Sequence, residues 1–118
     1  MSKDTGQLGE NMACEYLVNN GFVILARNYR FRQHEIDIIA SKNDCLHFVE
    51  VKLRGSDNFG SPASFVSKAQ QRSIAKAAEA FLLSLETDPD CQFDIVSIYK
   101  ENNRFKIEYI DEAFRPMF

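Results

Sequence analysis

Long apolar runs are missing from this sequence. No stretch approaches the roughly eighteen apolar residues that a membrane-spanning helix needs, and the first ten residues are polar where a signal peptide would turn apolar. Low-complexity tracts are missing as well, which disfavours disorder in a chain that is 45% apolar and has ten phenylalanines. These absences predict a folded, cytoplasmic protein with no membrane segment.

Cysteine pairs at metal-binding spacing are also absent. Cys14, Cys45 and Cys91 are odd in number, far apart and outside any C-x-x-C pattern. We therefore expect reduced thiols rather than a disulfide framework or a zinc site. The two histidines, His34 and His47, stand alone and do not change that expectation.

The charge is unevenly distributed along the chain. The net charge is -3, yet residues 27 to 76 carry nine Lys and Arg against five Asp and Glu, a local balance of +4. A basic middle inside an acidic protein allows local phosphate binding without demanding it.

Hydrophobic periodicity predicts seven elements in a single domain that covers residues 1–118, a length that suits one hydrophobic core. Their order, α-β-β-β-α-β-β, predicts an α/β fold in which helices flank a mixed central sheet. The predicted elements are residues 7–20, residues 22–25, two hairpin strands within 34–53, a helix from 64 or 67 to 86, and strands 93–99 and 104–110.

Polar or flexible composition predicts three irregular segments. Residues 28–33 are expected to form a basic connection, residues 55–62 a mobile loop, and residues 112–118 a helical or irregular tail. Gly21 is expected to end the first helix.

The first hairpin places ionisable groups in strands that are otherwise apolar. A two-residue turn at residues 43–44 would put Asp37 opposite Glu50 and Glu35 opposite Lys52, on one face of the sheet. Two carboxylates that close cannot both stay ionised cheaply without a cation between them. The pattern fits either a hard-oxygen site for Mg²⁺ or Mn²⁺ with a lysine beside it, or cross-strand ion pairs on a solvated face.

Several motifs together resemble a known group of proteins. Asp37, followed after twelve residues by Glu50-Val51-Lys52, resembles the signature of the PD-(D/E)XK restriction-endonuclease-like superfamily. More specifically, the chain is similar to the YraN-type family of small bacterial proteins, whose fold is related to archaeal Holliday junction resolvases. The matching segments are GQLGENMACEYL (6–17), ILARNYR (24–30), HEIDIIA (34–40), FVEVKLR (48–54), SKAQQR (67–72) and FDIV (93–96).

The resemblance implies a restriction-endonuclease-like fold and a metal site in the hairpin. It implies Mg²⁺ bound by Asp37, Glu50 and the Val51 carbonyl, with Lys52 assisting the attacking water and hydrolysis leaving a 5′-phosphate and a 3′-hydroxyl. One departure is His34, which stands where the family usually has glycine and so affects the approach to Asp37.

Further residues each have a functional and a plain interpretation. Glu10 is expected to approach the metal site, although an acidic residue early in a helix also complements the helix dipole. Gln70 resembles a glutamine that supports the active site in related nucleases, but Ser67-x-x-Gln70 is also a capping box. Glu35 is expected to be the ion-pair partner of Lys52 rather than a metal ligand.

Basic residues of the middle region are candidates for phosphate contact. Lys68 and Arg72 are four residues apart on the second helix, a spacing that gives either a phosphate-tracking stripe or a solvated face. The nucleic-acid-binding candidates are Arg30, Arg32, Arg54, Lys68 and Arg72.

These observations favour a metal-dependent endonuclease that acts on DNA, with branched or repair intermediates as one substrate class and a homodimer as one assembly. The alternative is a catalytically silent nucleic-acid-binding or interaction module on the same fold.

Overall fold

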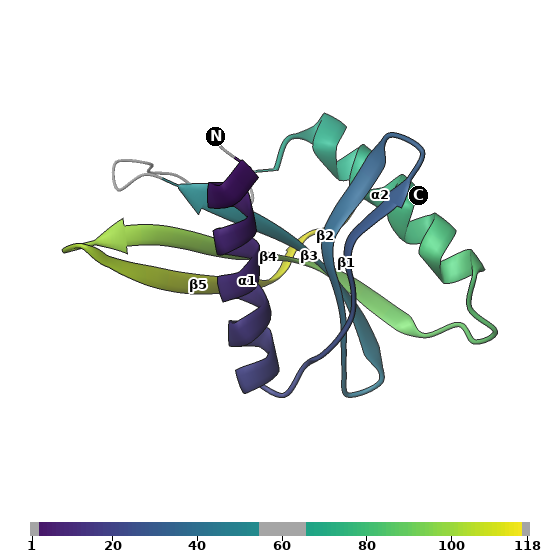
Figure 1. The fold of residues 1–118 in the computed structure, drawn as a ribbon. Coiled ribbons are helices and arrows are strands. Elements are labelled where there is room, and N and C mark those ends of the chain that lie inside the picture. Colours follow the sequence, from purple (N-terminus) through teal and green to yellow (C-terminus); the bar gives the residue numbers. More distant parts are fainter. Residues whose placement is uncertain (1–2, 55–65, 117–118) are drawn as a thin grey trace.

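The computed structural model describes residues 3–54 and 66–116, with side chains from residue 6 onward. The loop expected over residues 55–62 lies outside these ranges. Two helices and five strands follow the predicted order (Figure 1). They are α1 (Lys3–Asn19), β1 (Val23–Phe31), β2 (His34–Lys42), β3 (Cys45–Arg54), α2 (Lys68–Leu83), β4 (Asp90–Glu101) and β5 (Arg104–Phe114).

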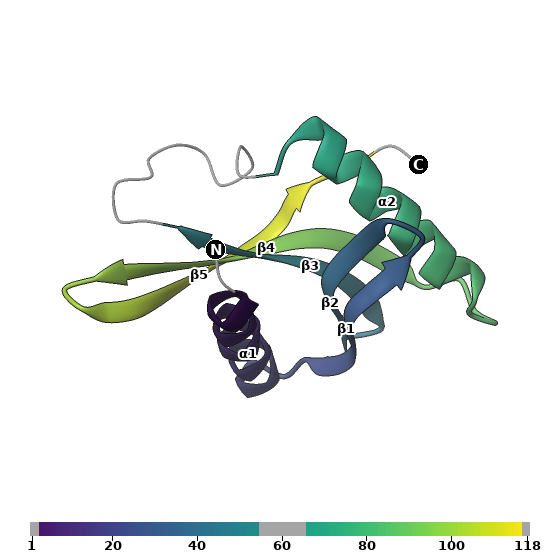
Figure 2. The ribbon, with the colours of Figure 1, turned by 45° about the horizontal axis from the view of Figure 1, so that its top comes forward.

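The five strands form one mixed sheet between two helices. Their spatial order is β1-β2-β3-β4-β5, and only β3 and β4 are parallel. A parallel pair needs a crossover connection, and α2 provides it. The helices lie on opposite faces of the sheet (Figure 2). No helix among the described residues is both long and apolar enough to cross a membrane.

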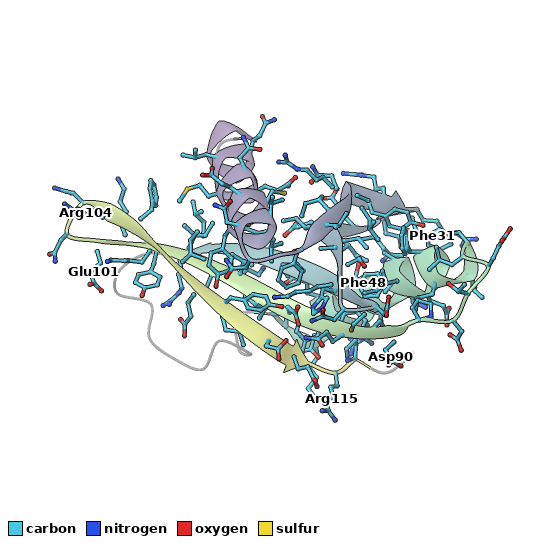
Figure 3. All side chains as sticks on the ribbon, turned by 90° about the horizontal axis from the view of Figure 1, so that it is seen from below. Phe31, Phe48, Asp90, Glu101, Arg104 and Arg115 are labelled. Carbon is cyan, nitrogen blue, oxygen red and sulfur yellow. The ribbon has the colours of Figure 1, made fainter. Side chains whose placement is uncertain are left out.

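Each face of the sheet has its own hydrophobic core. Phe48 and Ile39 belong to the cluster that packs under α2, as does Ile74 of that helix. Val49 and Leu17 belong to the cluster under α1. β3 therefore buries both faces, which is typical of a central strand and agrees with its two apolar stripes. Figure 3 shows Phe48 in the packed body of the molecule, while Glu101 and Arg104 lie at the far tip of the β4–β5 hairpin.

The turns have the predicted chemistry. Asn43 and Asp44 have φ values of 54° and 62°, and Lys42 pairs with Cys45, so the expected two-residue turn is confirmed. The same arrangement recurs in the second hairpin at residues 102–103. Gly21, with φ of 89°, follows α1 and ends it as expected.

Two irregular segments were predicted wrongly. Residues 28–31 are part of β1, because Tyr29 pairs with Ile36 and Phe31 pairs with His34. β1 lies at the edge of the sheet formed by the described strands, and an edge strand tolerates polar and basic side chains that a central strand would exclude. Residues 112–114 continue β5, which ends in the buried Phe114.

Candidate functional site

Asp37 lies where β2 and β3 separate. The pairing of the two strands follows the predicted register but ends at Ile38 and Val49, so it does not include the expected opposition of Asp37 to Glu50. Side-chain alternation also breaks here, because Ile36 belongs to the core under α2 while Ile38 belongs to the core under α1. Asp37 Oδ2 instead accepts a hydrogen bond from the Val51 amide at 2.8 Å. The Asp37 carboxylate therefore lies just beyond the last β2–β3 pair and is bonded to the β3 backbone.

Glu50, Gln70 and Lys52 form a hydrogen-bonded chain that continues from Asp37. The Glu50 carboxyl shares a hydrogen bond with Asp37 and accepts another from Gln70 Nε2 at 2.6 Å. Gln70 Oε1 in turn accepts from Lys52 Nζ at 3.1 Å. The four predicted residues of β2, β3 and α2 are thus brought together. Ser67 also caps α2, with its hydroxyl accepting from the Gln70 amide, which confirms the capping interpretation of that motif.

The Glu50 carboxyl keeps its proton in the folded protein. Burial raises the pKa of Glu50 far above its ordinary value, and the hydrogen bond and negative charge of Asp37 add to that rise, while Lys52 opposes it. At neutral pH the pair therefore carries one proton between two carboxyl groups. This is the expected behaviour of two acidic groups that lie close together without a cation.

A cleft of about 580 Å³ opens beside Asp37 on the α1 side of the sheet. Its lining mixes polar and apolar surface and carries charged side chains of both signs, which can contact a charged ligand. The charged residues along it are Glu10, Arg27, Arg30, Glu35 and Asp37.

Glu10 lines this cleft, but its carboxylate is already engaged. Oε1 accepts hydrogen bonds from Arg27 Nε at 2.9 Å and Asn28 Nδ2 at 2.8 Å. The adjacent Gly9 allows α1 to approach β3 closely, because a Cβ there would lie 2.7 Å from Leu53 Cδ1. Glu10 and Asp37 thus line the same cleft, and the sequence interpretation did not foresee Arg27 and Asn28 as the partners of Glu10.

Glu35 does not pair with Lys52 as expected. Its carboxylate forms an ion pair with Arg30 at 3.0 Å, across the β1–β2 ladder in which these residues are direct partners. The expected register would have placed Glu35 beside β3, but the two strands have already separated at this point. Lys52 instead donates its hydrogen bond to Gln70.

His34 contacts α2. Its Nδ1 lies 2.7 Å from the Ser73 hydroxyl, one turn after Gln70. The side chain that replaces the family's usual glycine is thus held against the helix that carries Gln70.

Arg54 differs from the other nucleic-acid-binding candidates. It donates hydrogen bonds to Ser97 and Glu108, and its guanidinium lies 4.4 Å from the centre of the Tyr99 ring. Only 17% of the side chain is exposed. Arg54 is therefore held within the sheet rather than extended toward solvent.

The remaining basic candidates are exposed but lie on two sides of the sheet. Arg30 lines the cleft, and Arg32 follows β1 with its guanidinium over the Phe31 ring. Lys68 and Arg72 belong to α2, on the opposite face from α1. Of these four residues, only Arg30 lines the cleft beside Asp37.

A second polar cluster, which the sequence interpretation did not predict, lies on β3, β4 and β5. His47 Nδ1 is 2.7 Å from Asp94 Oδ2, and the Tyr109 hydroxyl donates to the same oxygen. Burial and this contact raise the pKa of Tyr109, so the phenol stays protonated at neutral pH. An acidic residue inside the apolar run FDIVSI was the available signal.

The fold and the paired carboxyl groups define the class of this protein. It is a restriction-endonuclease-like α/β domain in which Asp37, Glu50, Lys52 and Gln70 meet at the separation of two strands. The sequence pattern of the uncharacterised protein family UPF0102 matches residues 9–98, and the chain belongs to this family.

Relatives match across nearly their full lengths. A UPF0102 protein of Flavobacterium psychrophilum is 43% identical over 111 residues, which is 94% of this chain and 93% of the relative. A UPF0102 protein of Chlorobium limicola is 46% identical over 116 residues, which is 92% of this chain and 90% of the relative. UPF0102 is the YraN-type family that the sequence motifs indicated.

Proposed function

We propose that this protein is a metal-dependent endonuclease that hydrolyses phosphodiester bonds of DNA. The observation that carries the proposal is the hydrogen-bonded pair of carboxyl groups, Asp37 and Glu50, with Lys52 held nearby through Gln70. A structural ion-pair network would match each carboxylate with a cation or a set of donors. Here Glu50 remains protonated because it is buried, and the neighbouring Asp37 raises its pKa further.

The donor set fits a hard divalent cation. Asp37 and Glu50 offer carboxyl oxygens, and a cation that replaced the proton would offset both the burial of the Glu50 charge and its repulsion from Asp37. The residues that would hold Mg²⁺ or Mn²⁺ are Asp37 and Glu50, with Glu10 and the Val51 carbonyl as further ligands. Such an ion, when bound, supplies charge stabilisation at the scissile phosphate.

The other residues of the site bind and orient the substrate. Lys52 Nζ, held by Gln70 Oε1, would donate a hydrogen bond to the attacking water or to a phosphate oxygen and offset the charge that develops there. Arg30 on the cleft wall would contact a neighbouring phosphate, at the cost of its exposed ion pair with Glu35.

One observation favours the alternative function, a nucleic-acid-binding module that does not cleave. Glu10 is occupied by Arg27 and Asn28, so one of the expected ligands already has its charge compensated. Such a module would bind DNA with affinity that falls as salt rises, and it would leave the polymer intact.

Cleavage of labelled duplex, single-stranded and four-way-junction DNA, in Mg²⁺ or Mn²⁺, tests the proposal. We expect wild-type protein to cut at least one substrate, Asp37→Asn to lose the activity, and Glu35→Gln, which changes another carboxylate of the same cleft, to keep it. Equal cleavage by wild type and Asp37→Asn would place the chemistry elsewhere. Binding without cleavage in either metal would support the module.

A further inference from the structure

A second cleft lies on the α1 side of the sheet, near the beginning of β3. Its volume is about 350 Å³, and it lies at the other end of β3 from Glu50 and Lys52. The side chains that line it include Tyr16, Phe22, Lys42, His47, Tyr109 and Asp111. It is separate from the cleft beside Asp37, with which it shares no lining residue.

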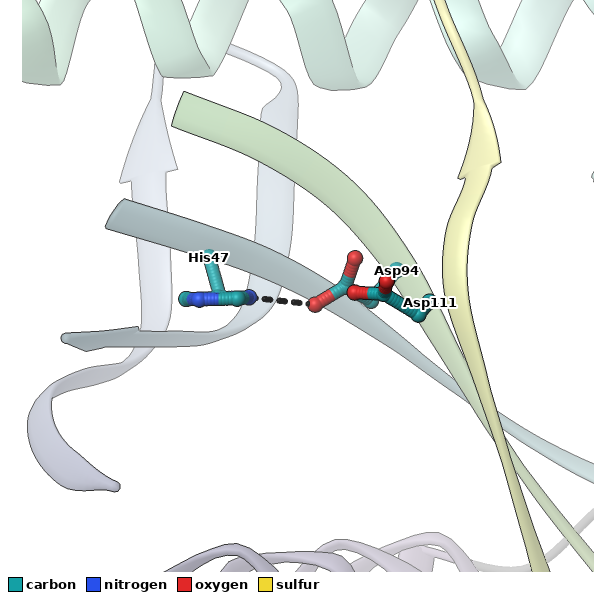
Figure 4. Close-up of side chains that lie close together, drawn as sticks. All are labelled: His47, Asp94 and Asp111. Atoms are coloured by element: carbon teal, nitrogen blue, oxygen red, sulfur yellow. Dashed lines mark hydrogen bonds and ion pairs between the residues drawn. The ribbon is translucent and has the colours of Figure 1, made fainter. Parts of the chain in front are cut away.

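Three metal-ligating side chains converge here from three adjacent strands. His47 comes from β3, Asp94 from β4 and Asp111 from β5, and one ligand atom of each lies within 4.8 Å of the others. Figure 4 shows the His47 ring directed at Asp94, with Asp111 beside that carboxylate. The Nδ1 to Oδ2 distance of 2.7 Å is that of a hydrogen bond, and it would have to open to about 3.3 Å for both atoms to bind one tetrahedral ion.

Within the described residues, His47 is the only basic side chain paired with either carboxylate of this cluster. Asp94 is fully buried and Asp111 is exposed, and a neutral group, the Gln92 amide, donates to both. Asp111 forms no ion pair among the described residues.

The second nitrogen of His47 is free and opens onto the cleft. His47 is nine-tenths buried, and its hydrogen-bond contacts within the described residues all involve Nδ1. No fully buried polar side-chain atom in this part of the chain lacks a partner, so Nε2 must reach the cleft that His47 lines. The ring can therefore carry its single proton on Nε2, facing water, which leaves the Nδ1 lone pair for a metal ion.

We propose that His47, Asp94 and Asp111 form a second metal site, one for a divalent transition-metal ion such as Zn²⁺ or Co²⁺. One imidazole nitrogen and two carboxylates suit borderline ions of this kind better than Mg²⁺. On binding, the ion would displace the Gln92 amide from the two carboxylates, and the ring proton of His47 would move from Nδ1 to Nε2 through solvent, with no net proton released from the ring. The bound ion links β3, β4 and β5 and stabilises the folded chain.

Zinc titration in the Asp37→Asn background tests this site without DNA or cleavage, so its outcome is independent of the proposed endonuclease activity. Calorimetry should find one Zn²⁺ per chain, and nitrogen-15 spectra of the imidazoles should show the Nδ1 signal of His47 shifting. Adding Asp111→Asn, at an exposed position, should weaken binding at least about tenfold. His34→Gln, the matched change at the other histidine, should leave it unaltered.

Three results would overturn the proposal. The first is that no zinc binds in the Asp37→Asn background. The second is that Asp111→Asn leaves zinc binding unchanged. The third is that Asp111→Asn keeps zinc binding and Cys45→Ser abolishes it. The last would assign the ion to the thiol near this cluster instead.

Discussion

The two ends of β3 each carry a buried acidic cluster, and the clusters accommodate their carboxyl groups differently. Toward the end of the strand, Glu50 stays protonated and shares a hydrogen bond with Asp37. Near its beginning, Asp94 accepts hydrogen bonds from His47, Tyr109, Gln92 and a backbone amide. The Asp37–Glu50 cluster has few hydrogen-bond donors, whereas several donors surround the Asp94 carboxylate.

The number of donors around a buried carboxylate separates a structural role from a candidate catalytic one. A carboxylate with a full set of donors is stable as it stands and holds its neighbours in place, as Asp94 does for three adjacent strands. When two neighbouring carboxyl groups share one proton, a cation placed between them would allow both to ionise. The Asp37–Glu50 pair is therefore the better candidate for catalysis, and the Asp94 cluster is also a structural anchor of the sheet.

The largest expected effect is on the donor-rich cluster. Asp94→Ala should lower the free energy of unfolding by about 3–5 kcal/mol, because His47, Tyr109 and a backbone amide lose their buried acceptor. Urea unfolding in the presence of a chelator measures this. Asp111→Ala, at an exposed position, should cost less than about 1 kcal/mol. Similar values for the two variants would mean that the Asp94 network contributes little.

The next effect concerns activity at the other cluster. Lys52→Met should lower the cleavage rate at saturating DNA by about 100-fold, equivalent to about 2.7 kcal/mol, while leaving the folded state nearly as stable. The side chain is only partly buried and its hydrogen bond is to Gln70. Lys76→Met, on the exposed side of α2, is the control that should retain full rate. A loss confined to DNA affinity would remove Lys52 from the chemical step.

A pH-dependent effect should follow from the protonated Glu50. Unfolding releases its proton at any pH between the ordinary value near 4.5 and the raised pKa in the folded protein. The free energy of unfolding should therefore fall as pH rises above about 4.5, by at most about 1.4 kcal/mol per pH unit, and the contribution is fully present only below that pH.

Glu50→Gln should remove this slope, whereas Glu35→Gln should keep it. Urea unfolding at several pH values between about 5 and 8, without divalent ions, measures the difference. Parallel curves for wild type and Glu50→Gln would show that Glu50 is ionised in the folded protein.

The smallest effect should be on DNA binding. Arg30→Ala should weaken binding only a few-fold and lower the slope of log affinity against log salt by about 0.9, the loss of one phosphate contact. Arg115→Ala, which removes an exposed charge beyond the end of β5, should leave the slope unchanged. Fluorescence anisotropy over a range of salt concentrations tests both. Equal slopes would place the DNA away from the cleft beside Asp37.

Local rules explain how much of the fold was predictable. Helical and strand periodicity gave the element order, and residue types that tolerate positive φ gave the turn at residues 43–44 and hence the register near it. That register predicted that Asp37 and Glu50 lie close together, although the strands separate just before this pair. The resemblance to a known family added Gln70, which no pairing rule connects to Glu50.

Features that depend on distant parts of the chain were not predictable. Periodicity could not show that the pairing of β2 with β3 ends at Ile38 and Val49 and leaves Glu35 unpaired with β3. The pairing of Glu35 with Arg30 was therefore missed. The contact between His47 and Asp94 depends on the parallel register of β3 and β4, which no turn residue specifies. The engagement of Glu10 by Arg27 depends on how α1 lies against β1.

The central claim is that a divalent cation replaces the proton shared by Asp37 and Glu50. Calorimetric titration of Mn²⁺ near pH 7, repeated in two buffers with different ionisation enthalpies, measures the ion bound and the protons released together. The account predicts release of about one proton per ion from the wild-type site and none from the same site in Glu50→Gln. Binding without proton release, or no binding at this site even with DNA present, would contradict it.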